Sequence, residues 1–233
     1  MTTLTWTKER PAVTRTPGSY EEYLAWPGEE THIVEWKNGE IIEYIPPLDH
    51  HQDVTGFLYS LLAAFVRLLD IGVVRVAPLE VKLWPNGPSR EPDVFFVAKE
   101  RLSQLTDRRF LGGPDLAIEI VSTSSTRADR VEKFIEYEQA GVREYWIIDP
   151  RRGKEQADFY QLEPSGRFVS VPLDDAGRYH SAVLPGFHFD PAALRVDPLP
   201  PPQFLLAELA KDLPALPDDL RAAYHALYVA LKQ

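Results

Sequence analysis

One carboxylate interrupts an apolar, β-branched run in the stretch "DLAIEIV" at residues 115–121. Side chains of an extended strand alternate between its two faces, so Leu116, Ile118 and Ile120 would share one apolar face. Glu119 would point to the opposite face. A buried carboxylate costs several kcal/mol unless a cation, a proton or hydrogen bonds compensate it. We therefore expect a compensating group beside Glu119.

A second carboxylate, Asp93, precedes the apolar run "VFFVA" at residues 94–98. The segment between them is long enough for Asp93 and Glu119 to lie on neighbouring strands. Carboxylates on adjacent strands can bind an oxygen-preferring dication such as Mg²⁺ or Mn²⁺. The chain has no cysteine, which excludes thiolate ligands and disulfides. From spacing alone, the stronger interpretation is structural: Glu119 pairs with Lys133, and Asp93 caps a turn.

Helices and strands are predicted on both sides of Asp93. Ser19 is a candidate N-cap of a short helix. Asn38-Gly39 separates two β-rich runs and predicts a hairpin. Residues 51–69 repeat apolar side chains at helical spacing, which predicts a long packed helix. The runs "GVVRVAPLEVKLW" and "PDVFFVA" predict strands, with Pro92 at the start of the second because proline cannot donate to a strand ladder.

The C-terminal half begins with the strand that contains Glu119, followed by a predicted helix over about residues 126–140 and the strand "REYWIIDP". Later residues predict a hairpin in "ADFYQLEPSGRFVSVPL" and an edge strand in "YHSAVLPGFHFD". The proline-rich "DPLPPPQ" indicates a boundary before two short amphipathic helices. We therefore divide the chain into a flexible arm (1–18), one domain (19–197), and a proline-rich linker with C-terminal helices (198–233).

The composition is that of an ordinary globular protein. With 233 residues and 44% hydrophobic content, the chain can bury a full core. No stretch approaches the roughly 18 apolar residues of a membrane span, and no signal peptide is evident, so we expect no membrane partner and a cytoplasmic location. The formal charge of −10 opposes nonspecific adhesion to nucleic acid. This net charge does not exclude an enzyme with a small acidic site and a local basic rim.

The segments "EPDVFFV" and "DLAIEIVSTSSTRADRVEKFIEYEQAGVREYWIIDP" resemble the Uma2 family of restriction-endonuclease-like proteins, within the PD-(D/E)XK nuclease superfamily. The segments "VEWKNGEIIEY" and "PPLDHHQDVTGFLYSLL" extend the resemblance, which covers about residues 20–195. The resemblance implies an α/β (α+β) fold, restriction-endonuclease-like, with a central mixed β-sheet flanked by helices. To this core the chain adds β-hairpins and a C-terminal helical appendage. It also implies that Asp93 and Glu119 are metal ligands.

The lysine that the superfamily motif places two positions after the glutamate is replaced by Val121. The family's pattern suggests that Lys133, on the following helix, supplies the missing charge. Asp129, Lys133 and Tyr137 recur every fourth position and would share one helix face, from which a lysine stem can reach the strand. Lys133 would then orient the attacking water and stabilise charge developing on a phosphate.

Two further residues fall on positions that the resemblance implies are functional. Glu35 is a candidate further metal ligand, with an exposed strand residue as the alternative. His51 could contact phosphate or assist proton transfer, although His50 competes for that role and either histidine could simply cap the helix.

The residues and the resemblance together favour a Mg²⁺- or Mn²⁺-dependent endonuclease that hydrolyses phosphodiester bonds in DNA. The alternative is a catalytically inactive nuclease fold that serves as an interaction or regulatory module. The acidic charge and the displaced lysine favour that alternative.

The C-terminal stretch "LPDDLRAAYHALYVALKQ" places Leu220, Tyr224, Leu227 and Leu231 along one stripe. A short helix is marginal alone in water, so something must cover this stripe. It could pack on its own domain or pair with a second chain. We lean towards a homodimer, because two-fold dimers are the commonest homo-oligomers.

Overall fold

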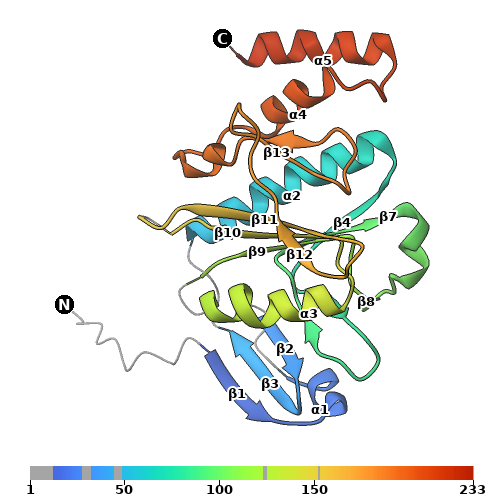
Figure 1. Ribbon diagram of the computed structural model, residues 1–233, viewed down its shortest axis with the longest axis vertical. Coiled ribbons are helices and arrows are strands. Elements are labelled where there is room, and N and C mark those ends of the chain that lie inside the picture. The colour runs from blue at the N-terminus through green and yellow to red at the C-terminus, as the bar shows by residue number, and fades with distance from the viewer. Residues whose placement is uncertain (1–12, 28–32, 45–48, 123–124, 152, 233) are drawn as a thin grey trace, which may run out of the picture.

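The structure is a computed structural model that describes residues 13–27, 33–44, 49–122, 125–151 and 153–232. Its two six-stranded sheets are covered by helices, and its C-terminal helices lie at one end of the molecule (Figure 1). This α+β architecture with mixed sheets and flanking helices agrees with the predicted fold class.

The first sheet contains strands from the N-terminal half of the chain. Its order is β1-β3-β2-β6-β5-β8, and β5 and β8 pair in parallel while the other neighbours are antiparallel. The strands are β1 (Val13–Pro17), β2 (Ile33–Lys37), β3 (Glu40–Tyr44), β5 (Glu80–Lys82), β6 (Ser89–Arg90) and β8 (Arg109–Leu111).

The second sheet has the order β12-β11-β10-β9-β7-β4, and β9 and β10 form its parallel pair. The strands are β4 (Gly72–Val76), β7 (Val94–Ala98), β9 (Leu116–Ile120), β10 (Glu144–Asp149), β11 (Gln156–Leu162) and β12 (Phe168–Ser170). A separate two-stranded sheet joins β13 (Tyr179–His180) to β14 (His188–Phe189). The segment expected to add an edge strand therefore forms its own small sheet instead.

Helices cover the second sheet from both sides, with α2 on one face and α3 near the other (Figure 1). The α-helices are α1 (Tyr20–Leu24), α2 (Asp49–Leu69), α3 (Phe134–Gln139), α4 (Pro202–Ala210) and α5 (Asp218–Leu231). The short helices are η1 (Lys99–Gln104), the π-helical turn η2 (Ala128–Lys133) and η3 (Pro191–Arg195).

Strand β9 is buried on both faces, whereas the sequence predicted one dry face. Leu116, Ile118 and Ile120 pack in the core beneath α2. Ala117 and Val121 belong to a second core cluster. The parallel pairing with β10 explains the difference, because parallel strands are usually covered on both sides. Glu119 therefore lies in a largely dry layer.

The local predictions in the N-terminal half are confirmed. Ser19 caps α1 in a reciprocal capping box with Glu22. Asn38 and Gly39 both have positive φ, 50° and 79°, as the two-residue turn between β2 and β3 requires. This hairpin places β2, with Glu35 at its centre, in the first sheet.

Both ends of the predicted domain need correction. Residues 13–17 were expected in a flexible arm, but they form β1 and pair with β3; residues 1–12 lie outside the described part. The C-terminal appendage is also part of the core, because Leu209, Leu213 and Leu216 are buried with residues of α2.

Helix α2 is long and apolar enough, over His50–Leu69, to cross a membrane by length and composition alone. The expectation that no stretch approaches such a span therefore does not hold for these measures. Leu58, Leu61 and Phe65 of this helix are fully buried beneath the second sheet, so the fold uses α2 as a core helix.

Candidate active site

Strand pairing brings Asp93 and Glu119 together. Val94 of β7 pairs with Ile118 of β9 in antiparallel register, so the preceding Asp93 lies across from Glu119. The Asp93 Oδ2 atom accepts a hydrogen bond of 2.7 Å from the Ile120 amide. Both carboxylates are buried, with exposed fractions of 6% and 2%. The prediction that they lie on neighbouring strands is confirmed.

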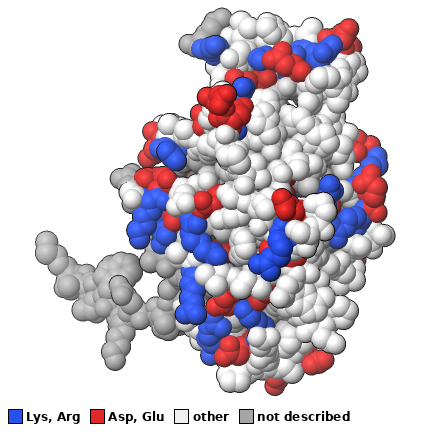
Figure 2. All heavy atoms as spheres, in the orientation of Figure 1, with Lys and Arg blue, Asp and Glu red and all other residues white. Residues whose placement is uncertain are grey.

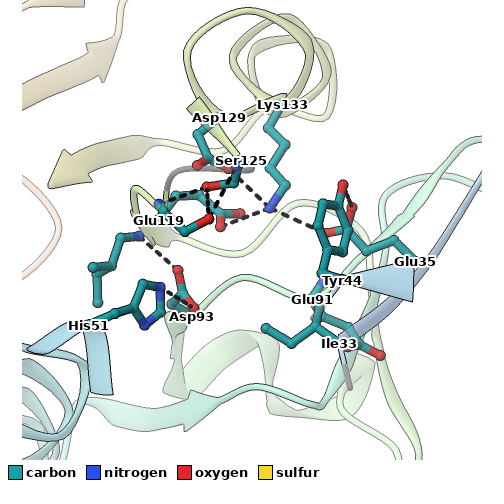
Figure 3. Close-up of a pocket in the computed structure, with 12 residues that line it drawn as sticks. Ile33, Glu35, Tyr44, His51, Glu91, Asp93, Glu119, Ser125, Asp129 and Lys133 are labelled. Atoms are coloured by element: carbon teal, nitrogen blue, oxygen red, sulfur yellow. Dashed lines mark hydrogen bonds and ion pairs between the residues drawn. The ribbon is translucent and has the colours of Figure 1, made fainter. Parts of the chain in front are cut away.

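Lys133 reaches this pair from the last residue of the π-helical turn η2. Its Nζ atom donates to Glu119 Oε2 over 2.9 Å and lies 3.2 Å from Glu35 Oε1. The predicted reach from helix to strand is therefore confirmed (Figure 3). Tyr137, one turn further, donates to Glu119 Oε1 over 2.6 Å, so both oxygens of Glu119 have partners from the helical segment.

Glu35 is held by a fully buried ion pair. Arg90 Nη1 lies 2.6 Å from Glu35 Oε2, and both side chains have no exposed surface. The Tyr44 hydroxyl donates to the same oxygen over 3.1 Å. Arg90 also donates to Glu136 over 2.7 Å, which links β2 and β6 to α3. Glu35 is thus a buried residue in an ion network, not the exposed strand residue that the sequence left open.

The structure distinguishes the two neighbouring histidines. His51 lines the pocket, and its Nε2 atom lies 3.5 Å from Asp93 Oδ1. Burial lowers the pKa of His51, but the adjacent Asp93 outweighs this effect, so the pKa lies above its ordinary value. His50 lines a different hollow, beside the proline-rich segment.

Charges around Lys133 set the protonation of the site. Burial raises the pKa of Glu35, but Lys133 and Arg90 outweigh burial and lower it to about 2. Burial lowers the pKa of Lys133, and the carboxylates of Glu119 and Glu35 raise it well above its usual range. Lys133 is therefore an ammonium and Glu35 a carboxylate at neutral pH.

The remaining carboxyl groups lack enough positive charge nearby. Burial raises the pKa of Glu119 and of Asp129, and Lys133 only partly offsets this. Burial and the nearby Glu35 raise the pKa of Glu91 to about 8. The pocket therefore contains more carboxyl groups than cations, and it favours uptake of protons or of a metal cation.

The donor chemistry of this pocket fits a hard cation such as Mg²⁺ or Mn²⁺. Glu35, Glu91, Asp93, Glu119 and Asp129 all line it, and all offer oxygen atoms. Within the described ranges, no three acidic, histidine or cysteine side chains converge as a preformed metal cage. Mg²⁺ commonly binds through one or two protein carboxylates and keeps its other positions for water or phosphate. The arrangement is compatible with binding of that kind.

Sequence reasoning did not assign three residues that the structure places in or beside the pocket: Arg90, Glu91 and Asp129. Asp129 carried a usable signal, since it precedes Lys133 by one helical turn. Arg90 and Glu91 carried none, because their partner Glu35 is distant in sequence and meets them only through the pairing of β2 with β6.

Comparisons with known proteins show the family and the fold. No curated protein matches the chain. One solved structure that matches is described as "a putative nuclease belonging to DUF820" from Anabaena variabilis ATCC 29413. It shares 20% identity, covers 75% of this chain and 96% of its own, and has a TM-score of 0.55, which shows a common fold. The Uma2 family model, described as "Putative restriction endonuclease", matches residues 20–195. The chain belongs to the Uma2 family.

Proposed function

We propose that this protein is a divalent-metal-dependent endonuclease that hydrolyses phosphodiester bonds in DNA. One observation carries the proposal: Lys133 donates to Glu119 over 2.9 Å at the point where strand register sets Asp93 beside Glu119. Two carboxylates can hold a divalent cation and an ammonium can stabilise charge on a phosphate, which are two contributions that metal-assisted phosphodiester hydrolysis uses. Membership in the family described as "Putative restriction endonuclease" supports it.

Asp93 and Glu119 would hold the cation, which is Mg²⁺ or Mn²⁺. When bound, such a cation polarises a phosphate and lowers the pKa of water. The Ile120 amide fixes one oxygen of Asp93. Tyr137 fixes one oxygen of Glu119. These hydrogen bonds orient the two carboxylates before any ligand arrives.

Lys133 would act as a fixed positive charge. Its pKa lies well above the usual range, because surrounding carboxylates outweigh its burial. A lysine that stays protonated cannot serve as a general base. It can donate to a phosphate oxygen and stabilise the negative charge that develops there.

Glu35 and His51 would support the site from either side. Glu35 pairs with both Arg90 and Lys133, so we favour a role in positioning the Lys133 ammonium over the direct metal ligation first considered. His51 lies beside Asp93, where its imidazole could hold that carboxylate in place and contact phosphate.

The DNA substrate requires local contacts at the site, because the formal charge of the chain is −10. Figure 2 shows basic and acidic side chains interspersed over the visible face. The same charge pattern, with Lys133 already paired to Glu119, favours the second candidate function: an inactive nuclease fold that acts as an interaction module. We propose a cytoplasmic location for either function.

The test is a cleavage screen across single-stranded, duplex and branched DNA with Mn²⁺, Mg²⁺ or EDTA. The wild type should cleave at least one substrate only with a divalent cation, and Asp93→Asn should abolish that activity. Asp115→Asn is the matched control, because Asp115 is equally buried but binds the Ala98 amide and Arg101 away from the pocket. Cleavage that persists in Asp93→Asn would refute the proposal.

A further inference from the structure

The Asp129 carboxylate is buried in the pocket without a hydrogen bond to either oxygen. Its exposed fraction is 1%. Among the described residues, its two oxygens and one Arg90 nitrogen are the buried side-chain polar atoms that lack a hydrogen-bond partner. Proteins rarely keep such atoms, because each costs free energy that hydrogen bonding would recover.

Each of the other carboxylates of the pocket accepts at least one hydrogen bond. Arg90 holds Glu35. The Ile120 amide binds Asp93, and Lys133 and Tyr137 bind Glu119. The Val34 amide binds Glu91.

Lys133 only partly compensates the Asp129 carboxylate. Its Nζ atom lies 3.3 Å from Asp129 Oδ1, but it already donates to Glu119 over a shorter distance and also lies near Glu35. One ammonium thus faces three carboxylates. With Arg90 assigned to Glu35, the group left with least compensation is Asp129.

The backbone holds Asp129 in this position. Its amide donates to the Ser125 carbonyl over 2.9 Å, and the Tyr145 hydroxyl donates to the Asp129 carbonyl over 2.8 Å. Both main-chain groups are satisfied while the side chain is not. Asp129 also lies in the π-helical turn, a feature often found at functional sites. Figure 3 shows Asp129 and Lys133 approaching Glu119 from the helix, with Asp93 and His51 on the other side.

We infer that Asp129 is a further ligand of the divalent cation, one that completes an oxygen-donor set with Asp93 and Glu119. The inference rests on the proposed function, since it names a third protein ligand at the same site. A dication between these side chains would add positive charge where Asp129 now shares one ammonium with Glu119 and Glu35. Mg²⁺ and Mn²⁺ accept carboxylate ligands of this kind.

The test measures Mn²⁺ binding by isothermal titration calorimetry, together with urea unfolding in EDTA, on the full chain without DNA. Asp129→Asn should bind Mn²⁺ at least tenfold more weakly than the wild type. In EDTA, its unfolding midpoint should equal or exceed that of the wild type, because the substitution removes a buried carboxylate whose oxygens have no hydrogen-bond partner. Asp129→Ser is measured alongside as a second variant without the carboxylate.

Asp115→Asn again serves as the control, because its carboxylate is fully partnered outside the pocket. It should lower the unfolding midpoint in EDTA while Mn²⁺ affinity stays within about twofold of the wild type. We thus expect opposite results from the two variants: Asp129→Asn loses Mn²⁺ affinity but not stability, and Asp115→Asn loses stability but not Mn²⁺ affinity.

The outcomes separate the two proposals. Wild-type affinity for Mn²⁺ in both Asp129 variants would overturn the role of Asp129 and leave the proposed nuclease intact. Absence of Mn²⁺ binding by the wild type would overturn both. Loss of folding by both Asp129 variants in EDTA would overturn the inference, because it would mean that the carboxylate is already compensated.

Discussion

The side chains of Lys133 and Glu119 meet across the gap between η2 and β9, with Nζ 2.9 Å from Oε2. Both side chains are almost completely buried, with exposed fractions of 6% and 3%. Val121, at the position where the resemblance leads one to expect a lysine, fills a core position, and the ammonium beside Glu119 comes from the following helical segment.

Replacing Lys133 by Met should reduce cleavage by at least about 100-fold, since the variant lacks the charge that stabilises the developing phosphate anion. It should also lower the free energy of unfolding by about 3–5 kcal/mol, because Glu35, Glu119 and Asp129 lose a shared buried cation. Single-turnover cleavage and urea unfolding measure the two effects separately.

Lys37→Met is the matched control for Lys133→Met. Lys37 pairs with Glu132 and Glu136 outside the pocket, and its side chain is 20% exposed. We expect cleavage within about threefold of the wild type and a smaller loss of stability, about 1 kcal/mol. Equal losses of cleavage in both variants would indicate that Lys133 acts only through folding.

Glu35 should make stability depend on acid pH. Its pKa is about 2 in the folded protein, against an ordinary value of 4.5. A lowered pKa stabilises the fold above the unfolded value, and that stabilisation is lost as pH falls from about 4.5 towards 2. The free energy of unfolding of Glu35→Gln should lie below that of the wild type at neutral pH. This difference should shrink by up to about 3 kcal/mol as pH falls over this range. Urea unfolding of both proteins at several pH values in EDTA measures this difference. A difference that stays constant with pH would contradict the prediction.

Glu91 should give stability the opposite dependence on pH from Glu35. Its pKa is raised from 4.5 to about 8, mainly by burial. Stability contributed by the neutral carboxyl is full below about pH 4.5 and is lost as pH rises towards 8. As pH rises from 5 to 8 in EDTA, the free energy of unfolding of Glu91→Gln should therefore increase relative to that of the wild type by about 3 kcal/mol. Parallel stability profiles for the two proteins would show that Glu91 is already ionised.

The sequence predicted features that depend on neighbouring residues. The hairpin at Asn38-Gly39 needs only two residues with positive φ. The helix face that carries Lys133 follows from four-residue spacing. By contrast, the pairing of Glu35 with Arg90 depends on how β2 and β6 meet in the sheet, which no local pattern encodes.

The burial of β9 on both faces was also not predicted. The alternation of residues shows which side chains are apolar, but it does not show which faces of the strand are covered. Ala117 and Val121 flank Glu119 on the face that seemed polar. The π-helical turn in η2 left no signal either, since its residues fit an ordinary helix equally well.

Helix α5 remains the proposed surface for pairing with a second copy of the chain. Leu220 and Tyr224 of its stripe pack against the core, while Leu227 and Leu231 are 40% and 43% exposed. Size-exclusion chromatography with light scattering should give a dimer for the wild type and a monomer for a Leu227→Glu, Leu231→Glu variant. A monomeric wild type would refute the dimer, and a dimeric variant would place the interface elsewhere.

The central claim is tested most directly by Mn²⁺-dependent, single-turnover cleavage of DNA by the wild type, Glu119→Gln and Glu144→Gln. Both glutamates are buried, on the adjacent strands β9 and β10, but Glu144 binds Trp146, Ser181 and the Ala182 amide outside the pocket. Wild type and Glu144→Gln should cleave at rates within about threefold. Glu119→Gln should be slower by at least about 100-fold while it remains folded. Cleavage by Glu119→Gln at the wild-type rate would contradict the proposed metal-dependent site.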